Sequence, residues 1–293
     1  MSCSPSGNPS RRKVLSLGAA ALFVQKLAAP AVAREAPIQF GLTPVFLTSD
    51  LELLGRLQSY LERSTGYAVE LVNRRTYQEV TALLTSGQID GAWICGYPFV
   101  SHQAELQLVA VPLWHSKPLY QSYVIVDANR GVTDIMSLRG DIHAFSDPDS
   151  NSGFLVTRAA LVEHGQRPES FFSKTMFTYG HRNVIRAVAS GLAQSGSVDG
   201  YVYEVVSQLE PELTKRTAIV TASGWHGFPP IAAPKNAPST ERLARLKRAL
   251  LDMHLSEDGR AILEMLELDG FASENPSLFD SIAKNAALVA AAG

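Results

Sequence analysis

The chain has 293 residues, and its 26 basic and 28 acidic residues leave a formal net charge of −2. This balance, without a long basic run after the first residues, argues against nucleic acid and anionic membranes as partners. Cys3 lies in the extreme N-terminal segment, so Cys95 would be alone in a processed chain. We therefore expect no intramolecular disulfide and a fold stabilised by a sizeable core.

The first 33 residues resemble an export signal. Arg11 and Arg12 precede an apolar run over 14–27, and the small-residue sequence Ala31-Val32-Ala33 follows. The run is too short for a stable membrane span, which favours a signal peptide over residues 1–33, cleaved near Ala33. The paired arginines favour the twin-arginine route, with ordinary secretion as the alternative. Either route predicts a periplasmic protein.

Strand and helix patterns alternate in the first third of the chain. Apolar residues recur at helical spacing in two segments, and three short apolar segments flank them. Ser49 or Asp50 can cap the first helix. The segments are strand 38–44, helix 50–64, strand 67–72, helix 76–86 and strand 91–95. This βαβαβ order predicts buried parallel strands.

The alternation resumes in the middle of the chain, which predicts a second α/β unit. The helix–Gly–Asp-Gly–strand order of 77–93 has an echo in 184–202, where an apolar strand would follow Asp199-Gly200. Two lobes built alike would explain the echo, although it is also ordinary α/β punctuation. The segments are strand 120–126, strand 141–146, helix 154–164, strand 174–178 and closing helices from 239 onward.

A polar loop over 145–154 joins a predicted strand to a predicted helix. A helix N-terminus presents unpaired N–H groups and partial positive charge, and hydroxyl and amide side chains add donors. Such a junction lies at the carboxyl ends of the strands, where open α/β sheets bind ligands. The loop therefore predicts an oxyanion site. The alternative is a well-capped helix after an Asp-Pro turn.

Several ordered segments resemble one family of binding proteins. They are Gly41–Pro44, Asp90–Trp93, Ser146–Val156, Gly180-His181, Val198-Asp199 and Leu268–Phe271. The chain from about 38 to 272 resembles the PhnD-like phosphate, phosphite and phosphonate periplasmic binding proteins of ABC transporters. The resemblance implies a two-lobed α/β protein of type II-like architecture, each lobe a mixed sheet flanked by helices. It further implies a monomer that takes an oxyanion to a membrane permease, without catalysis or cofactor.

The two lobes would be built from separate parts of the chain. Lobe 1 is expected over 36–118 plus 227–293, and lobe 2 over 119–226. The crossings fall near Lys117-Pro118 and Trp225–Pro230, where aromatic residues and prolines suit a hinge.

The resemblance assigns ligand contacts residue by residue. Ser150, Asn151 and Ser152 would hold the oxyanion, with Tyr77 and His181 facing it and Glu204 near the rest of the ligand. Gly153 in the same loop and Tyr97, which follows the strand end that faces the expected cleft, are further candidate contacts. The last alignment is loose, so Asp199, Tyr201, Tyr203 and Glu204 compete for one role. Structural roles are the alternatives: Tyr77 in a core, His181 in a cap or core, and Glu204 on a solvated helix face.

Two residues depart from the family pattern. Asp149 adds a carboxylate to the anion loop, which disfavours a dianion and suits a protonated oxyanion or a neutral hydroxy acid. Cys95 ends an apolar strand facing the expected cleft, where it is a small buried hydrophobe or a soft ligand. Together they suit arsenite, so an AioX-like arsenite sensor signalling to a membrane histidine kinase is the alternative function.

An enzyme is the remaining class. Cys95 beside His102, His115 or His181 could form a nucleophile with a base. No Cys–His spacing is diagnostic, however, and the sequence carries no metal cluster, nucleophile elbow or nucleotide fingerprint. The sequence therefore predicts a binding protein rather than an enzyme.

Overall fold

The structure is a computed structural model, and it describes residues 36–43, 51–237 and 240–292. The expected export signal and the cap at Ser49 or Asp50 lie outside these residues. Within the described ranges, no helix combines the length and apolar character that a membrane crossing requires.

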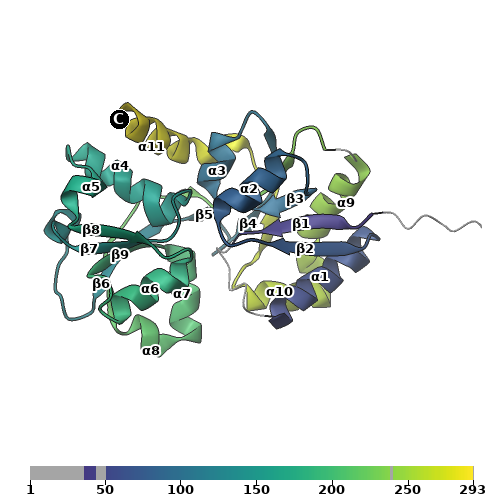
Figure 1. Cartoon of the computed structure of the whole chain (residues 1–293). Helices are drawn as coiled ribbons and strands as arrows, with labels where there is room; N and C mark the ends of the chain where they lie inside the picture. Colours follow the sequence, from purple (N-terminus) through teal and green to yellow (C-terminus); the bar gives the residue numbers. More distant parts are fainter. Residues whose placement is uncertain (1–35, 44–50, 238–239, 293) are drawn as a thin grey trace, which may run out of the picture. The chain divides into compact units, whose positions relative to one another are not determined.

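The first sheet is mixed and has six strands (Figure 1). Its strands, in spatial order, are β13 (Gly270–Ala272), β4 (Leu106–Leu113), β12 (Ile231–Pro234), β3 (Gly91–Trp93), β1 (Ile38–Leu42) and β2 (Val69–Asn73). The β1 strand runs parallel to β2 and β3, which confirms the predicted βαβαβ unit. Both β12 and β13 run antiparallel to β4, so the C-terminal part of the chain returns to complete this sheet.

Helices with one apolar face cover this sheet. In α1 (Leu51–Thr65), Leu53, Leu57 and Leu61 recur every four residues and are buried, as an amphipathic helix requires. A reciprocal capping box between Thr76 and Glu79 starts α2. The remaining helices are α2 (Tyr77–Thr85), α3 (Gly96–Ser101), α9 (Thr240–Leu251), the short η3 (Met253–Leu255) and α10 (Glu257–Met265).

The second sheet has five strands. In spatial order they are β10 (Thr217–Ala222), β6 (Ser122–Asp127), β9 (Ser195–Asp199), β7 (Ile142–Phe145) and β8 (Lys174–Phe177). The β7 strand runs parallel to β8 and β9, whereas β6 runs antiparallel to β9 and β10. Its helical elements are η1 (Ile135–Leu138), the π-helix η2 (Asn151–Leu155), α4 (Val156–Glu163), α5 (Pro168–Phe171), α6 (His181–Ala189), α7 (Gly200–Leu209) and α8 (Pro211–Thr214).

The expected echo between the two halves is wrong at its strand. The β3 strand follows Asp90, but β9 precedes Gly200 and ends at Asp199, and α7 begins at the glycine. The two aspartates do different work: Asp90 accepts the backbone N–H of Gln39, whereas Asp199 accepts that of Val202 and so caps α7. An Asp-Gly pair can thus begin a strand or a helix.

A third, two-stranded ribbon joins the chain segments that lead into and out of the second sheet. The expected strand over 120–126 divides at Gln121 into β5 (Leu119–Tyr120) and β6. The β5 strand pairs antiparallel with β11 (His226–Gly227). The two predicted crossings therefore lie side by side.

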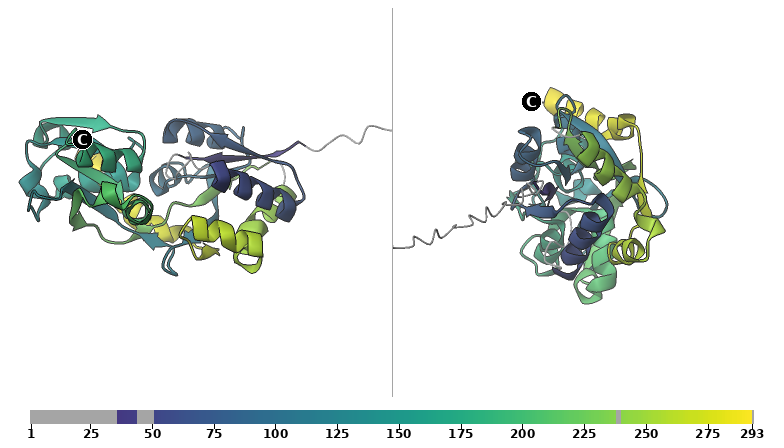
Figure 2. Two further views of the ribbon diagram at one scale, coloured as in Figure 1. Left: turned by 90° about the horizontal axis from the view of Figure 1, so that it is seen from below. Right: turned by 90° about the vertical axis from the view of Figure 1, so that its right-hand side faces the viewer.

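The C-terminal segment packs against this ribbon and against both groups of helices. It consists of η4 (Pro276–Phe279) and α11 (Asp280–Ala291), which contacts α3 and α4; the yellow helix lies beside the teal segment that carries α4 in Figures 1 and 2. A Cβ on Gly227 would lie 2.9 Å from the Phe279 ring, and one on Gly96 would lie 2.5 Å from Ile282 Cδ1. Glycine at both positions therefore lets η4 and α11 pack closely against these segments.

Candidate functional site

The polar loop after β7 forms a buried turn that ends in η2. Ser150 caps η2, and its Oγ accepts the Gly153 N–H over 2.9 Å. Ser150, Asn151 and Ser152 are fully buried. Gly153 packs so closely that a Cβ there would lie 1.8 Å from Ser146 Oγ. Only glycine fits at this point of the loop.

Asn151 links the loop to residues outside the second sheet. Its backbone N–H donates to Cys95 Sγ over 3.2 Å, and its Nδ2 donates to the Tyr120 hydroxyl over 2.9 Å. Asn151 Oδ1 and Ser146 Oγ are buried and have no hydrogen-bond partner among the described residues. The loop thus keeps hydrogen-bonding capacity beside Cys95 and Tyr120.

Ser152 connects the loop to β6 and β9. Its Oγ lies 3.4 Å from Asp199 Oδ2, and its carbonyl accepts the Ser122 hydroxyl over 2.6 Å. Burial is the main reason that the pKa of Asp199 is raised to about 7, against hydrogen bonds from Val202, Ser152 and Tyr201. A carboxyl group in this position can hold or release a proton near neutral pH.

The protonation of His181 follows from its contacts. The backbone N–H of Asp199 donates to His181 Nδ1 over 3.0 Å, so Nδ1 carries no proton. Burial lowers the pKa of His181 to about 3, so the ring is neutral and Nε2 carries its one proton. Nε2 lies 3.2 Å from the Tyr77 hydroxyl. His181 therefore donates to Tyr77, and the Tyr77 O–H remains able to donate to another acceptor.

Asp147 makes two contacts from the same loop. Its Oδ1 accepts the Asp149 N–H over 2.9 Å, and its Oδ2 accepts the Tyr77 N–H over 3.2 Å. Burial raises the pKa of Asp147, and it also raises that of the half-buried Asp149, where His102 acts in the opposite direction. Two carboxyl groups therefore lie on an anion-type loop.

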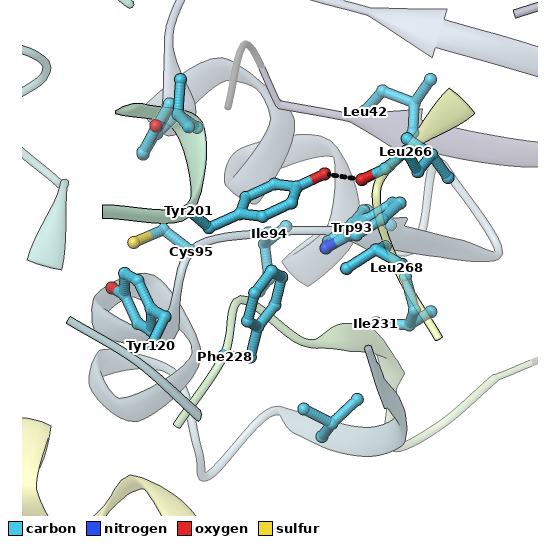
Figure 3. Packing of buried hydrophobic residues seen from close by; sticks show 14 of the residues in the cluster. Leu42, Trp93, Ile94, Cys95, Tyr120, Tyr201, Phe228, Ile231, Leu266 and Leu268 are labelled. Atoms are coloured by element: carbon cyan, nitrogen blue, oxygen red, sulfur yellow. Dashed lines mark hydrogen bonds between the residues drawn. The ribbon is translucent and has the colours of Figure 1, made fainter. Parts of the chain in front are cut away.

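Cys95 lies where β3 gives way to α3, with 2% of its surface exposed. Burial raises the pKa of its thiol to about 12, although backbone hydrogen bonds from Asn151 and Tyr97 act against this. The group is therefore a neutral thiol at physiological pH. Figure 3 shows it beside Tyr120 and Tyr201. Tyr97 itself is half-buried on α3.

The structure brings most of the expected site residues together, but Tyr203 and Glu204 make their contacts elsewhere, and the hydroxyl of Tyr201 is committed to another partner although its ring lies beside Cys95. Tyr201 donates to the Leu266 carbonyl over 2.5 Å (Figure 3), and Tyr203 pairs with Thr217. Glu204 accepts from Tyr123 and lines a surface groove with Trp114 and Glu267. Of the four competing residues, Asp199 is the one that contacts both Ser152 and His181.

Sequence reasoning missed two contributors, Tyr120 and Asp147. Tyr120 directly follows a predicted crossing, and Asp147 is the acidic residue of the Asp-Pro turn. These positions could have marked both residues as site candidates, but they do not indicate which atoms the two side chains contact. Among the described residues, none of the site's side chains pairs with Lys or Arg, and no group of three or more His, Cys, Asp or Glu could hold a metal ion.

Comparison with known proteins identifies the class. Residues 40–279 match the model of a family described as "ABC transporter, phosphonate, periplasmic substrate-binding protein". The match spans most of the chain, which therefore belongs to this family. Its membership favours a transport component over the sensor alternative.

Individual relatives agree with that membership. The phosphate-import protein PhnD of Mycolicibacterium smegmatis is 28% identical over 172 residues. The match covers 54% of this chain and 54% of that protein, so the chain spans about half the length of this relative. The binding-protein component of an ABC phosphonate transporter from Pseudomonas aeruginosa aligns with a TM-score of 0.79 and 18% identity over 87% of each chain. PhnD1 from Prochlorococcus marinus, solved with methylphosphonate, aligns at 0.77 and 17% identity over 85% of this chain and 97% of that one. These alignments confirm the predicted two-lobed α/β binding-protein fold.

Proposed function

We propose that this protein is the substrate-binding component of an ABC importer for a phosphorus oxyanion: a phosphonate, phosphite or phosphate. The observation that carries the proposal is the junction of the Ser150–Gly153 turn with Tyr77 and His181. It gathers hydroxyl and amide groups in a buried place, with the imidazole N–H of His181 committed to the Tyr77 hydroxyl. Donors shielded from water bind oxyanion oxygens strongly.

The lobes in this proposal are 36–118 plus 227–293 and 119–226. This division is supported by the two sheets, whose strands fall into those segments. The oxyanion would bind between the lobes, held by Ser150, Asn151, Ser152 and Gly153 from lobe 2 and by Tyr77 from lobe 1. His181 would orient Tyr77, and Cys95 and Tyr97 would border the site.

The charge balance of the site bears on the substrate. Asp147, Asp149 and Asp199 place carboxyl groups on or near the turn, and Lys and Arg do not pair with them in the described part of the chain. A fully ionised dianion would be repelled, whereas an oxyanion that keeps one proton can donate it to a carboxylate. The site therefore suits a singly charged, protonated phosphorus oxyanion.

The function further implies export to the periplasm by the 1–33 signal, a permease partner and release of the substrate unchanged. Calorimetric titration with methylphosphonate, phosphite, phosphate and sulfate tests the proposal. We expect one phosphorus oxyanion to bind clearly more tightly than sulfate and to be recovered chemically intact after binding. Failure of all three phosphorus oxyanions to bind would contradict it.

A further inference from the structure

Asp147 is a buried carboxylate that the binding of an oxyanion does not explain. It is 2% exposed, and its carboxyl group lies beside the turn that would hold an anion. Burying a charge is unfavourable unless hydrogen bonds compensate for it. Each of its oxygens accepts one backbone N–H, from Asp149 in the same loop and from Tyr77 on α2.

The second of these bonds joins a helix that covers the first sheet to a loop of the second sheet. Tyr77 is the first residue of α2, which covers the first sheet, whereas Asp147 follows a strand of the second sheet. The first N–H groups of a helix have no partner within it, and a carboxylate placed there also meets the positive end of the helix dipole. The Thr76 hydroxyl accepts the N–H of Glu79, and the Asp147 carboxyl supplies an acceptor for the N–H of Tyr77, which the capping box does not use.

We propose that Asp147 is a closure latch: its carboxylate caps α2 of the opposite lobe when the lobes close, and so sets ligand affinity without touching the ligand. The proposal rests on the proposed function only for the existence of a ligand. When the lobes separate, water replaces α2 around Oδ2, while the bond to Asp149 remains within the loop. The latch therefore acts on the balance between open and closed forms. A ligand that binds the closed form gains or loses apparent affinity with that balance.

Cys95 provides a readout that needs no ligand. It is buried and accepts the Asn151 N–H, and that bond also joins the two sheets' segments. A thiol reagent should reach it only when the lobes open. In the full chain with Cys3→Ser, Cys95 is the sole cysteine, so the labelling rate measures opening.

Two substitutions isolate the bond between the lobes. Asp147→Asn keeps an oxygen for the Asp149 N–H but presents an amide N–H to that of Tyr77, so donor meets donor. Asp147→Ser keeps a hydroxyl that can close the same local turn but is too short to reach α2 as well. Asp134→Asn is the matched control. Asp134 caps η1 by accepting the Met136 N–H over 2.6 Å, and both residues belong to the part of the chain that forms the second sheet.

We expect Cys95 to be labelled about tenfold faster in both Asp147 variants than in the parent, because both lose the hydrogen bond from the Tyr77 N–H to the carboxyl group. The Asp134 variant keeps that bond and should be labelled at the parent rate. Labelling reports the open fraction, whereas the apparent Kd for methylphosphonate should rise in proportion to the fall in the closed fraction. Parent-like labelling in both Asp147 variants at unchanged melting temperature would overturn the latch.

Labelling must also proceed through opening rather than unfolding. Opening exposes little surface, so its rate should hardly change with low urea, whereas labelling through unfolding accelerates steeply. If labelling is faster in both variants and its rate rises steeply with urea concentration, Asp147 has a purely structural role and the proposal is rejected. Because labelling uses no ligand, a chain that binds no phosphorus oxyanion would contradict the proposed function while leaving this test intact.

Discussion

The Tyr77 hydroxyl lies 3.2 Å from Nε2 of His181, although 104 positions separate the two residues and they belong to helices on different sheets. His181 is held in one tautomer by the backbone of Asp199. The donor of this pair is thereby determined, and the Tyr77 O–H is directed to a further acceptor. A side chain that could have been ordinary core is thus a preorganised hydrogen-bond donor.

Replacing Tyr77 by Phe tests this arrangement. The change removes the donor and leaves the buried His181 N–H unpaired, which should cost ~1–3 kcal/mol of stability. We expect at least tenfold weaker binding of methylphosphonate or phosphite by calorimetry. Tyr60→Phe is the control, because Tyr60 donates to the Ala249 carbonyl and both residues lie on helices that cover the first sheet. It should lose stability and keep its affinity. Equal affinities for the two variants would show that the Tyr77 hydroxyl makes no ligand contact.

Cys95→Ser should leave binding of a phosphorus oxyanion within about threefold of the parent. The thiol is neutral because burial raises its pKa to about 12, and its role in the structure is to accept the Asn151 N–H. A serine oxygen can accept the same bond. Calorimetric titration of parent and variant with one phosphorus oxyanion measures the difference. A loss of all binding would mean that sulfur itself contacts the guest.

Gly153→Ala should disrupt the turn. The added Cβ would lie 1.8 Å from Ser146 Oγ and 3.0 Å from His181 Cε1, so the loop or the imidazole must move. Overpacking of this kind costs ~1–3 kcal/mol, and we expect oxyanion binding to fall at least tenfold. Adding Ser146→Gly removes the nearest atoms and should restore part of the stability, as a double-mutant cycle by urea denaturation would show.

Gly55→Ala provides the contrasting control. Gly55 lies on the exposed face of α1, and a Cβ added there would have no atom within 4 Å. Alanine should therefore stabilise the helix by up to ~1 kcal/mol. If both glycine variants lost equal stability, close packing at Gly153 would not be the reason for its effect.

The first sheet's βαβαβ unit could be predicted because each element there is short, amphipathic or apolar, and marked by local residues such as the Thr76–Glu79 capping box. The antiparallel strands β12 and β13 could not, because they pair with β4 over more than a hundred positions. Gly91 and Gly200 follow identical signals and start different elements. The difference lies in what each preceding aspartate meets in three dimensions.

The candidate site shows the same limit. The turn at Ser150 was visible from its strand–loop–helix setting, since caps and anion sites use the same residues. The pairing of Asp147 with α2 and of Asn151 with Tyr120 depends on how the two sheets meet. The local sequence around each residue does not indicate how the two sheets are placed in space. Among Asp199, Tyr201, Tyr203 and Glu204, only the hydrogen bonds distinguish the residue that contacts Ser152.

Stability should fall as the pH drops below about 6.5. Burial lowers the pKa of His143 and His181 to about 3 and that of His226 to about 4, from 6.5. The unfolded chain therefore binds three protons near pH 5 that the folded chain excludes. Burial acts oppositely on Asp199, whose pKa rises to about 7, so the folded chain holds one proton that the unfolded chain lacks. The net uptake on unfolding is two protons, which predicts a loss of ~2.7 kcal/mol per pH unit near pH 5.

Urea denaturation without ligand at pH 7, 6, 5 and 4.5 measures this slope. Asp147 and Asp149, whose pKa values burial also raises, should flatten it at the acid end. His143 bonds Ser195 and Ser197 with its two ring nitrogens. His143→Gln can keep bonds to both hydroxyls while removing one titrating group, so its slope should fall by about one proton. His164→Gln, at an exposed position, should keep the parent slope. A parent whose stability is constant from pH 7 to 5 would show that these histidines are not buried in the neutral form.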